Sequence, residues 1–488
     1  MLNQLLGSFI LNNAYQIAKE RKQNILLVGG AIRDLYLNGS LGKDFDFILD
    51  TDVETMAYAF SHTCRGTAFC LDKERDNYRV IIPHQGESYT VDLAPILNSD
   101  VQSDLLNRDF SINSMALPLD KIFEKREFNL IDPAQGLHDL RKRQIRVSSL
   151  SSLINDPVRI LRAVRFSKKC SFSLEPQTVQ LIKEAMHGLP RCSRERIRSE
   201  FFKILDLPCA SSSLSELDRW GVLTLLIPEI ESMKGMTQGT HHDYELWEHL
   251  LRTVHCVETI LDTITHYFPR HSELLTTYFR EELETDVCRG SLLKCTALLH
   301  DTGKPLTRSI SDTQIHFYHH DREGEKITQE IAGRFKLGKK STRIMTAATR
   351  HHMRLITLYP SKTITHRATY RFYKDLEDAA LETLILTLAD TMATRESSDE
   401  RALLTLINEM LEYYFQEFTR HTPSPLLTGG EVMELLSLTP GKKVGIVLGL
   451  IEKAEREGKI STKEEAVKLI STYNLREESE IRGKEVPE

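Results

Sequence analysis

The chain has 488 residues, of which 41% are hydrophobic and 27% are charged, and its formal net charge at pH 7 is −6. One hydrophobic core does not extend over this length, so we expect roughly two to four domains. The net charge excludes a uniformly basic nucleic-acid binder, although local basic stretches remain at 141–146, 159–169 and 191–198.

Eight cysteines without a Cys-x-x-Cys pair argue against a zinc ribbon or a disulfide framework and fit a reducing compartment. The N-terminus lacks the basic stretch of a signal peptide, and no apolar run is long enough to span a bilayer. We therefore expect a cytoplasmic protein without a membrane partner. The sequence does not predict its oligomeric state.

Strand-like and helix-like segments alternate in the first part of the chain, with predicted strands at 25–28, 45–49, 78–82 and 88–94 and a short helix at 31–36. After residue 155 the pattern is helical almost to the end. We therefore predict an α+β protein with an α/β head followed by helical regions. The predicted parts are the head (1–150), a helical neck (151–228), a histidine-rich helical domain (229–400) and a tail of short helices (401–488) that ends in a charged, frayed segment (477–488).

A diglycine turn and two acids form the first candidate site. Strand 25–28 leads into Gly29 and Gly30, whose missing side chains let backbone N–H groups approach phosphate oxygens. Arg33 and the start of the following helix favour the same anion. Asp44 and Asp46 lie two residues apart on the next strand, so both point to one face and repel each other unless a cation lies between them. This pattern suits nucleotidyl transfer with Mg²⁺ bridging triphosphate oxygens.

Further polar residues follow in the head. Asp92 lies on strand 88–94 and is a candidate third carboxylate, either as general base for an attacking hydroxyl or as part of the metal site. Arg108 can pair with phosphates. Asp109 and Asn113, four residues apart on a predicted helix, share a face; Asn113 could hydrogen-bond a sugar, or Asp109 could orient an arginine.

The stretch 155–166 opens the neck. Pro157 suits the first turn of a helix, with Asp156 as its cap. Arg159 follows one turn later, and an aspartate and an arginine presented together match the donor and acceptor edge of a nucleobase. Arg162 and Arg165 continue along one side of the helix, three residues apart. We expect Asp156 both to cap the helix and to read a base.

Together these motifs resemble the class II tRNA nucleotidyltransferases, the family of bacterial CCA-adding enzymes and poly(A) polymerases with a polymerase-beta-like head. The resemblance spans nearly all of residues 25–205, with its motifs in order. These motifs are Gly29-Gly30 with Arg33-Asp34, Asp44-x-Asp46, residues 107–113, residues 132–140, Asp156-x-x-Arg159 and residues 193–200.

The resemblance implies that Asp44 and Asp46 bind Mg²⁺ with Asp92 as the third catalytic carboxylate. It also implies a neck that selects CTP or ATP through Asp156 and Arg159. The nucleotide-binding residues would be Gly29, Gly30, Arg33, Arg108, Asp109, Asn113, Asp156, Arg159, Arg162 and Arg165.

The chain departs from the family pattern at several positions. Asn107 stands where the family often has arginine, and Asn155 stands where it often has glutamate, a group that orients the base-reading pair. The segment 65–75 falls at the family's flexible loop and is similar to versions in relatives that add only CC or only A.

The histidine-rich domain resembles an HD phosphohydrolase. Neighbouring His and Asp side chains supply nitrogen and oxygen ligands together, which suits magnesium or a transition metal such as Mn, Ni or Co. The predicted ligands are His249, His300, Asp301 and Asp390, with His320 and His352 as extra ligands of a two-metal site. The neighbouring His319 and His351 leave those two assignments uncertain by one position, and the sequence does not decide whether this domain is catalytic or a retained fold.

The sequence thus predicts a tRNA nucleotidyltransferase that extends the tRNA 3′ end with C, A or both from CTP and ATP and releases pyrophosphate. The tail resembles the family's tRNA-contacting region. One alternative is a poly(A) polymerase with the same site and relaxed acceptor choice. Another is an HD phosphohydrolase whose head only senses nucleotide, and a non-enzymatic RNA-binding module is a third.

Overall fold

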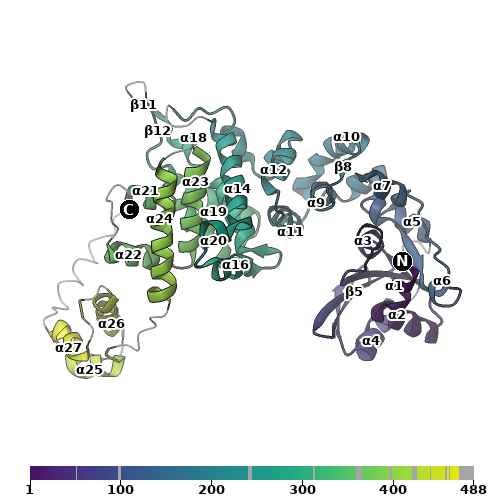
Figure 1. Ribbon diagram of the computed structural model, residues 1–488, viewed down its shortest axis with the longest axis horizontal. Helices are drawn as coiled ribbons and strands as arrows, with labels where there is room; N and C mark the ends of the chain where they lie inside the picture. The colour runs from purple at the N-terminus through teal and green to yellow at the C-terminus, as the bar shows by residue number, and fades with distance from the viewer. Residues whose placement is uncertain are drawn as a thin grey trace. The chain divides into compact units, whose positions relative to one another are not determined.

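The computed structural model describes residues 1–50, 52–96, 100–239, 244–311, 314–358, 365–394, 398–419, 426–439, 441–456, 459–460 and 462–471. It divides into two compact units (Figure 1). The first contains residues 1–232 with 284–287 and 333–336, and the second contains the rest. Among the described residues, no helix combines the length and the apolar character that crossing a bilayer requires.

A six-stranded mixed sheet with the order β3-β4-β5-β2-β1-β6 organises the first unit. β2 and β5 run parallel, and the other neighbours run antiparallel. The strands are β1 (Ile25–Val28), β2 (Asp44–Leu49), β3 (Thr67–Asp72), β4 (Asn77–His84), β5 (Glu87–Pro95) and β6 (Ala116–Pro118).

The four predicted strands correspond to β1, β2, β4 and β5. Strand β3, which lies in the segment 65–75, was not predicted. This edge strand is mostly exposed on both faces, so its sequence lacks the alternation that marks a half-buried strand.

The alternation of side chains along β2 separates its acids from most of the apolar core. Phe45, Phe47 and Leu49 are buried on one face, while Asp44 and Asp46 share the other face with Ile48. Ile48 joins a small buried cluster with Leu26, Val28, Leu105 and Ala116. Helices around the sheet are α1 (Leu2–Gly7), α2 (Phe9–Glu20), α3 (Gly30–Asn38), α4 (Val53–Cys64), α5 (Val101–Leu106), α6 (Leu119–Phe123) and α7 (Gly136–Lys142).

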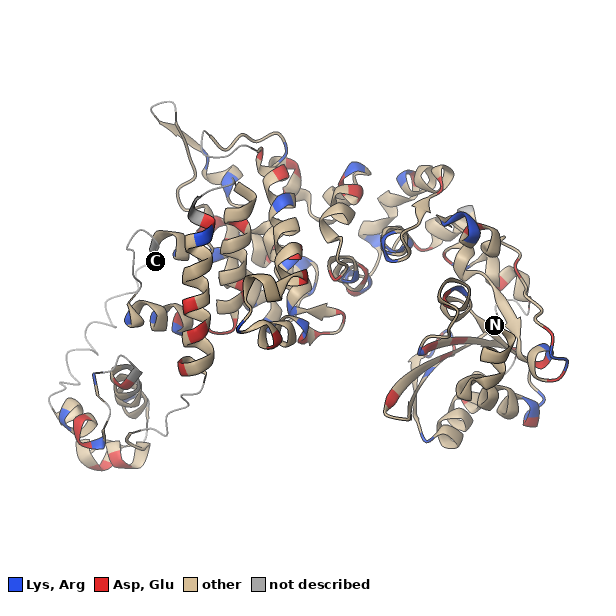
Figure 2. Cartoon of the chain, viewed as in Figure 1, with Lys and Arg blue, Asp and Glu red and all other residues tan. Residues whose placement is uncertain are grey.

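The remainder of the first unit is almost entirely helical, apart from the short parallel pair β7 (Gln144–Ile145) and β8 (Ser173–Leu174). Helix α9 packs against α11, and Figure 2 shows Lys and Arg concentrated on these two helices. The helices are α8 (Leu150–Asn155), α9 (Arg159–Cys170), α10 (Pro176–Ala185), α11 (Arg194–Leu205), α12 (Ala210–Arg219) and α13 (Val222–Leu226).

The second unit is a helical assembly around α17 (Arg289–Leu299), which is buried along its whole length. Helix α14 (Leu246–Asp262) packs against α17 and α23 (Ala380–Thr394), and α17 also contacts α20 (Lys339–His351). The other helices are α15 (Ile264–Tyr267), α16 (Ser272–Arg280), α18 (Lys304–Thr307), α19 (His320–Arg334), α21 (Arg354–Leu358), α22 (His366–Leu376) and α24 (Ser398–Tyr413). Its short strands include β11 (Ser309–Ser311) and β12 (Gln314–His316), while β9 (Glu282–Glu284) and β10 (Val287–Cys288) each place one residue in the segment 284–287 of the first unit.

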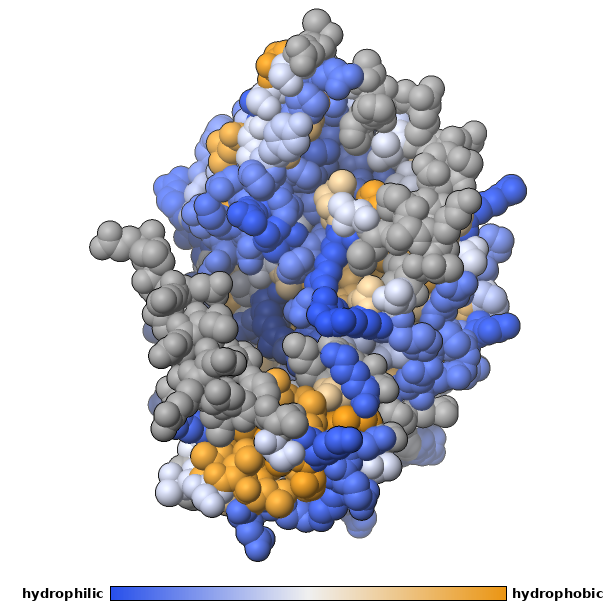
Figure 3. Space-filling model, turned by 90° about the vertical axis from the view of Figure 1, so that its left-hand side faces the viewer, coloured by the Kyte–Doolittle hydropathy of each residue, from blue (hydrophilic) through white to orange (hydrophobic). Residues whose placement is uncertain are grey.

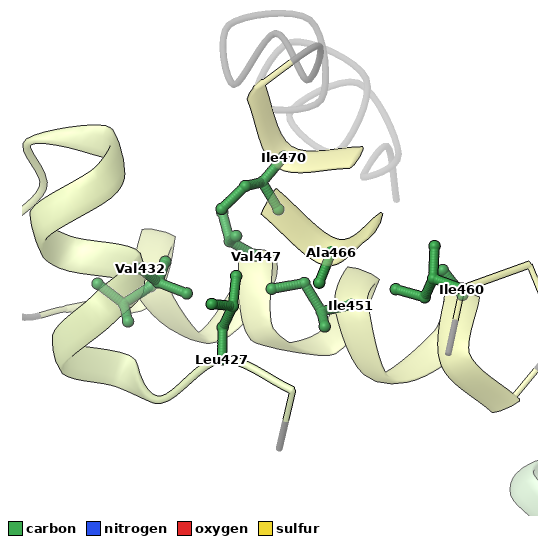
Figure 4. Packing of buried hydrophobic residues seen from close by; sticks show 9 residues of the cluster. Leu427, Val432, Val447, Ile451, Ile460, Ala466 and Ile470 are labelled. Carbon is green, nitrogen blue, oxygen red and sulfur yellow. The ribbon is translucent and has the colours of Figure 1, made fainter. Parts of the chain in front are cut away.

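Among the described residues of the tail, three helices share a small core of their own: α25 (Gly429–Leu436), α26 (Lys442–Arg456) and α27 (Lys463–Ser471). Leu427, Val432, Val447, Ile451 and Ile470 pack together there (Figure 4). A core this small leaves apolar side chains exposed, including Leu435. Figure 3 shows an apolar patch at the lower edge of the surface that faces the viewer. The predicted frayed segment 477–488 lies outside the described residues. The α/β head followed by helices confirms the predicted fold class.

Candidate functional site

Gly29 closes the turn between β1 and α3 in a conformation that other residues avoid. Its φ is +74° and its ψ is −136°. A Cβ atom at this position would lie 2.9 Å from Asp46 Oδ2, closer than real contacts allow. Gly29 therefore permits both the turn and the close approach of the Asp46 carboxylate, as only glycine can.

Three carboxylates come together on one face of the sheet. Val28 is the register partner of Asp46 on β2, and Asp46 is in turn the partner of Asp92 on β5. Burial raises the pKa of Asp46. The negative charges of Asp92 and Asp44 raise this pKa further, whereas the positive charge of Arg108 lowers it. A cation between these oxygens would remove the repulsion, and oxygen donors of this kind suit Mg²⁺. The donor set therefore fits the predicted metal.

The structure also gives Asp92 a partner that sequence analysis missed. Arg79 on β4 lies opposite Asp92 in the register of the sheet. Its Nε and Nη2 atoms donate to the two carboxylate oxygens of Asp92, each over 2.7 Å.

Asp109 and Asn113 lie in a buried chain of hydrogen bonds. Asn113 Nδ2 donates to Asp109 Oδ1 over 3.1 Å, and Arg33 Nη1 donates to Asn113 Oδ1 over 2.8 Å. Arg162 donates from Nε and Nη2 to Asp109 Oδ2 over 2.9 and 2.6 Å. Burial alone would raise the pKa of Asp109, but Arg162 holds it below its usual value. These contacts fit the predicted role in which Asp109 orients an arginine.

The helix expected over 109–113 was wrong. Helix α5 ends at Leu106, and a single 3₁₀ turn covers Ser111–Asn113. The Asp109 side chain accepts a hydrogen bond from the backbone N–H of Phe110, a local bond that competes with helix formation.

Asp156 does not cap the helix that follows it, contrary to expectation. Helix α9 begins at Arg159, and its N-cap, Val158, makes no side-chain bond. Asp156 Oδ2 instead accepts from Arg196 Nη2 over 2.6 Å and lies 3.5 Å from Arg159 Nε. The capping prediction failed because a turn at 157–158 precedes the helix and the two arginines bind this carboxylate. Its second oxygen, Oδ1, is buried and accepts no hydrogen bond from the described residues.

Most of the predicted nucleotide-binding residues line one cavity of about 390 Å³, a size in the range of small-ligand pockets. Three predicted residues of the head and neck are not in its lining: Asp44 and Asp92 lie next to Asp46 on the sheet, and Arg165 donates to Glu200 over 2.7 Å. The residues that line the cavity are Gly29, Gly30, Arg33, Asp46, Arg108, Asp109, Asn113, Asp156, Arg159, Arg162, Phe166 and Arg196.

The arginines in and beside this cavity are supported by residues that were not predicted for that role. The guanidinium groups of Arg33, Arg162 and Arg165 lie 5.1, 5.4 and 4.5 Å from the ring centre of Phe166. Glu200 on α11 pairs with both Arg162 and Arg165. The spacing of four between Arg162 and Phe166 is a signal for their contact, whereas no local pattern indicates Glu200.

A second cluster lies in the helical unit, where the six predicted metal ligands come together from helices α14, α19 and α23 and from the turns after α17 and α20. His249 Nε2 lies 3.0 Å from Asp390 Oδ1. Asp301 lies 3.4 Å from His300 Nε2, 3.3 Å from His320 Nε2 and 3.6 Å from His352 Nε2. His320 and His352, rather than their neighbours His319 and His351, make these contacts.

The histidines of this cluster are oriented by the backbone. The Nδ1 atoms of His300, His320 and His352 bond to the carbonyl oxygen three residues earlier, over 2.9, 2.8 and 2.7 Å. This leaves each Nε2 directed at the centre, as in metal-binding histidines. His300 Nε2 and Asp301 Oδ1 are buried and have no hydrogen-bond partner among the described residues, so the cluster fits a divalent metal.

The charges of this cluster are strongly coupled. Burial opposes protonation of His300, but Asp301 and Asp390 raise its pKa to about 10. Burial also opposes ionisation of Asp301, yet Lys304 and His300 hold the pKa of this carboxyl well below its usual value. A metal bound here would therefore replace protons.

Comparison with known proteins agrees with this geometry. The family model "Poly A polymerase head domain" matches residues 25–146, "Probable RNA and SrmB- binding site of polymerase A" matches 171–234, and "HD domain" matches 246–395. The A-adding tRNA nucleotidyltransferase of Deinococcus radiodurans is 34% identical over 92% of this chain and 95% of its own. The CC-adding tRNA nucleotidyltransferase of Thermus thermophilus is 29% identical over 93% and 95%.

The fold also matches a solved structure. The CCA-adding enzyme of Thermotoga maritima superposes with a TM-score of 0.58 over 95% of both chains, at 21% identity. The identity and coverage of the Deinococcus relative decide the family. The chain belongs to the tRNA nucleotidyltransferases, a family of metal-dependent enzymes, and is a nucleotidyltransferase with an HD domain.

Proposed function

We propose that this chain acts in the cytoplasm and adds the terminal A to tRNAs that end in CC, using ATP and Mg²⁺. The observation that carries nucleotidyl transfer is that one cavity joins the diglycine turn, Asp46 and the pair Asp156 and Arg159. The 34% identity to an A-adding relative supports A as the nucleotide, compared with 29% for a CC-adding one. All eight cysteines are free thiols, in keeping with a reducing compartment.

The transfer step follows from the positions of these residues. Bound by Asp44 and Asp46, Mg²⁺ would supply positive charge to the triphosphate. The backbone at Gly29 and Gly30 and the guanidinium of Arg108 hold the phosphates in line with the tRNA 3′-oxygen. That oxygen forms a bond to the α-phosphorus while the bond between the α-phosphorus and the bridging oxygen breaks, and pyrophosphate leaves. Asp92 takes the hydroxyl proton or completes the metal site.

Base selection is assigned to Asp156 and Arg159. Asp156 Oδ1, which accepts no hydrogen bond from the part of the chain that the structure describes, can accept one from the exocyclic amino group of adenine, and Arg159 can donate to the adjacent ring nitrogen. Cytosine presents the same donor and acceptor order, so this pair excludes G and U more readily than it separates A from C. The tRNA end must contribute to the final choice.

An extension assay on four tRNA transcripts tests this proposal. The transcripts end at the discriminator base, at C, at CC and at CCA, and each is incubated with Mg²⁺ and CTP, ATP or both. The proposal predicts that only the CC end grows, by one A, and then stops. Growth of the discriminator end to CC would make the chain a CC-adding enzyme, and growth without limit on ATP would make it a poly(A) polymerase.

We propose phosphoester hydrolysis as a second function, carried by the histidine cluster. Its support is the convergence of Nε2 atoms on Asp301, with His300 Nε2 and Asp301 Oδ1 buried and making no hydrogen bond within the described ranges. The ion would be Mg²⁺, Mn²⁺, Ni²⁺ or Co²⁺. Hydrolysis of 2′,3′-cyclic AMP and of a phosphomonoester should appear with one of these ions in the wild type and be lost in His300→Ala, while A addition continues. Equal hydrolysis by both proteins would refute this second function.

A further inference from the structure

A row of three charged side chains crosses the sheet beside the transfer site. Asp46 on β2, Asp92 on β5 and Arg79 on β4 are successive register partners. Partners on adjacent strands carry their side chains on the same face, about 5 Å apart. Arg79 therefore lies on the outer side of the acidic group, opposite the cavity, with Asp92 between it and Asp46.

We propose that Arg79 is a positioning residue that holds the carboxylate of Asp92 in the orientation required for the transfer reaction. Two parallel hydrogen bonds of 2.7 Å fix both the plane and the rotation of a carboxylate, which one bond would not do. The proposal rests on the role proposed above for Asp44, Asp46 and Asp92.

The surroundings of the pair favour this role over a purely stabilising one. The Arg79 and Asp92 side chains are 38% and 31% exposed, and ion pairs this accessible contribute little to stability. Arg79 also interacts with the charges of Asp44 and Asp46, so it partly balances the charge of the whole acidic group. Without Arg79, repulsion from Asp46 would turn the Asp92 carboxylate away. Among the described contacts, no other hydrogen bond holds this carboxylate in place.

The test measures metal binding and turnover separately. Mn²⁺ binding is measured in the presence of a non-hydrolysable ATP analogue, from the electron paramagnetic resonance signal of the free ion. The Mn²⁺ that Asp44→Ala still binds is subtracted, because it belongs to other sites. We expect Arg79→Gln to weaken Mn²⁺ binding or to lower kcat by about 10–100-fold, with the KM for ATP within about twofold of wild type. Arg79→Lys, which forms one bond instead of two, should fall between.

A matched control and a double variant complete the design. Arg270→Gln removes an exposed arginine that pairs with Glu412 in the helical unit, and it should leave Mn²⁺ binding and kcat unchanged. In an Asp92→Asn background, Arg79→Gln should change kcat by less than about twofold, because its effect passes through Asp92.

Three results would overturn the proposal. Arg79→Gln could retain both Mn²⁺ binding and kcat, it could raise only the KM for ATP or tRNA, or it could cost as much in the Asp92→Asn background as in wild type. The last two would mean direct contact with substrate. If Arg79→Gln does not fold, the same measurements on Arg79→Lys replace it. If Asp44→Ala itself kept activity, the proposed function would fail instead, so the two failures are distinguishable.

Discussion

Replacement of Gly29 by alanine tests how tightly the turn and the acidic group are packed together. The backbone angles of Gly29 lie in a region that L-residues adopt only at a cost of about 1–3 kcal/mol. The new methyl group would also stand 2.9 Å from Asp46 Oδ2 and 3.6 Å from Arg108 Nη1, so the carboxylate must move.

These effects have separate magnitudes. A loss of about 2 kcal/mol would lower the Tm by about 4–8 °C for a unit of this size and leave the protein folded. A displaced Asp46 would cost much more in rate, because misplacing a reacting group by about 1 Å can cost about 100-fold. We therefore expect Gly29→Ala to lower kcat by about 10–100-fold.

Thermal unfolding and single-turnover A addition to a CC-ending tRNA measure both effects. Gly39→Ala is the matched control, because Gly39 also has a positive φ, of +69°, and a methyl group there would meet no atom within 4 Å. It should lose stability and keep its rate. The reasoning fails if Gly29→Ala adds A at the wild-type rate, or if Gly39→Ala loses as much activity.

Three further predictions concern the acids and the histidine cluster. Asp44→Ala should eliminate nucleotide incorporation and leave tRNA binding intact in a filter assay, since Asp44 is exposed and the proposed function gives it only a metal-binding role; retained incorporation would refute the metal assignment. Because folding raises the pKa of Asp46, ionisation of this carboxyl destabilises the folded protein. In thermal unfolding scans without metal, stability should therefore fall as the pH rises from the pKa of Asp46 in the unfolded chain through its pKa in the folded protein. Asp46→Asn should abolish this fall. The same dependence of stability on pH in wild type and Asp46→Asn would contradict this prediction. Because the pKa of His300 is raised to about 10, calorimetry should show that divalent-metal binding to Asp44→Ala strengthens with pH and releases protons; binding independent of pH would count against the cluster as the site.

Local patterns predicted those parts of the site that lie close together in sequence. Gly29 and Gly30 after a strand, and Asp44 and Asp46 on one face of the next, follow from the periodicity of a strand and the conformations open to glycine. The residues that support them could not be predicted in this way. Arg79 meets Asp92 only through the register of β4 with β5, and Glu200 meets Arg162 only because α11 packs on α9.

Errors of prediction occurred where side chains compete with the backbone. Asp156 was expected to satisfy the N–H groups of a helix, but Arg196 and Arg159 offer its carboxylate stronger, charge-assisted partners. Asp109 bonds to the N–H of Phe110, and this ends the helical path predicted there. In both places a polar residue was interpreted from its position in a local motif, whereas one arginine partner, Arg196 for Asp156 and Arg162 for Asp109, is distant in sequence.

A structure of the chain with Mg²⁺ and a non-hydrolysable ATP analogue would show where the nucleotide binds. We expect the triphosphate to lie against Gly29 and Gly30 and the adenine amino group to donate to Asp156 Oδ1 over about 2.7–3.2 Å. A nucleotide bound at the histidine cluster, with the cavity beside Asp46 empty, would contradict this expectation.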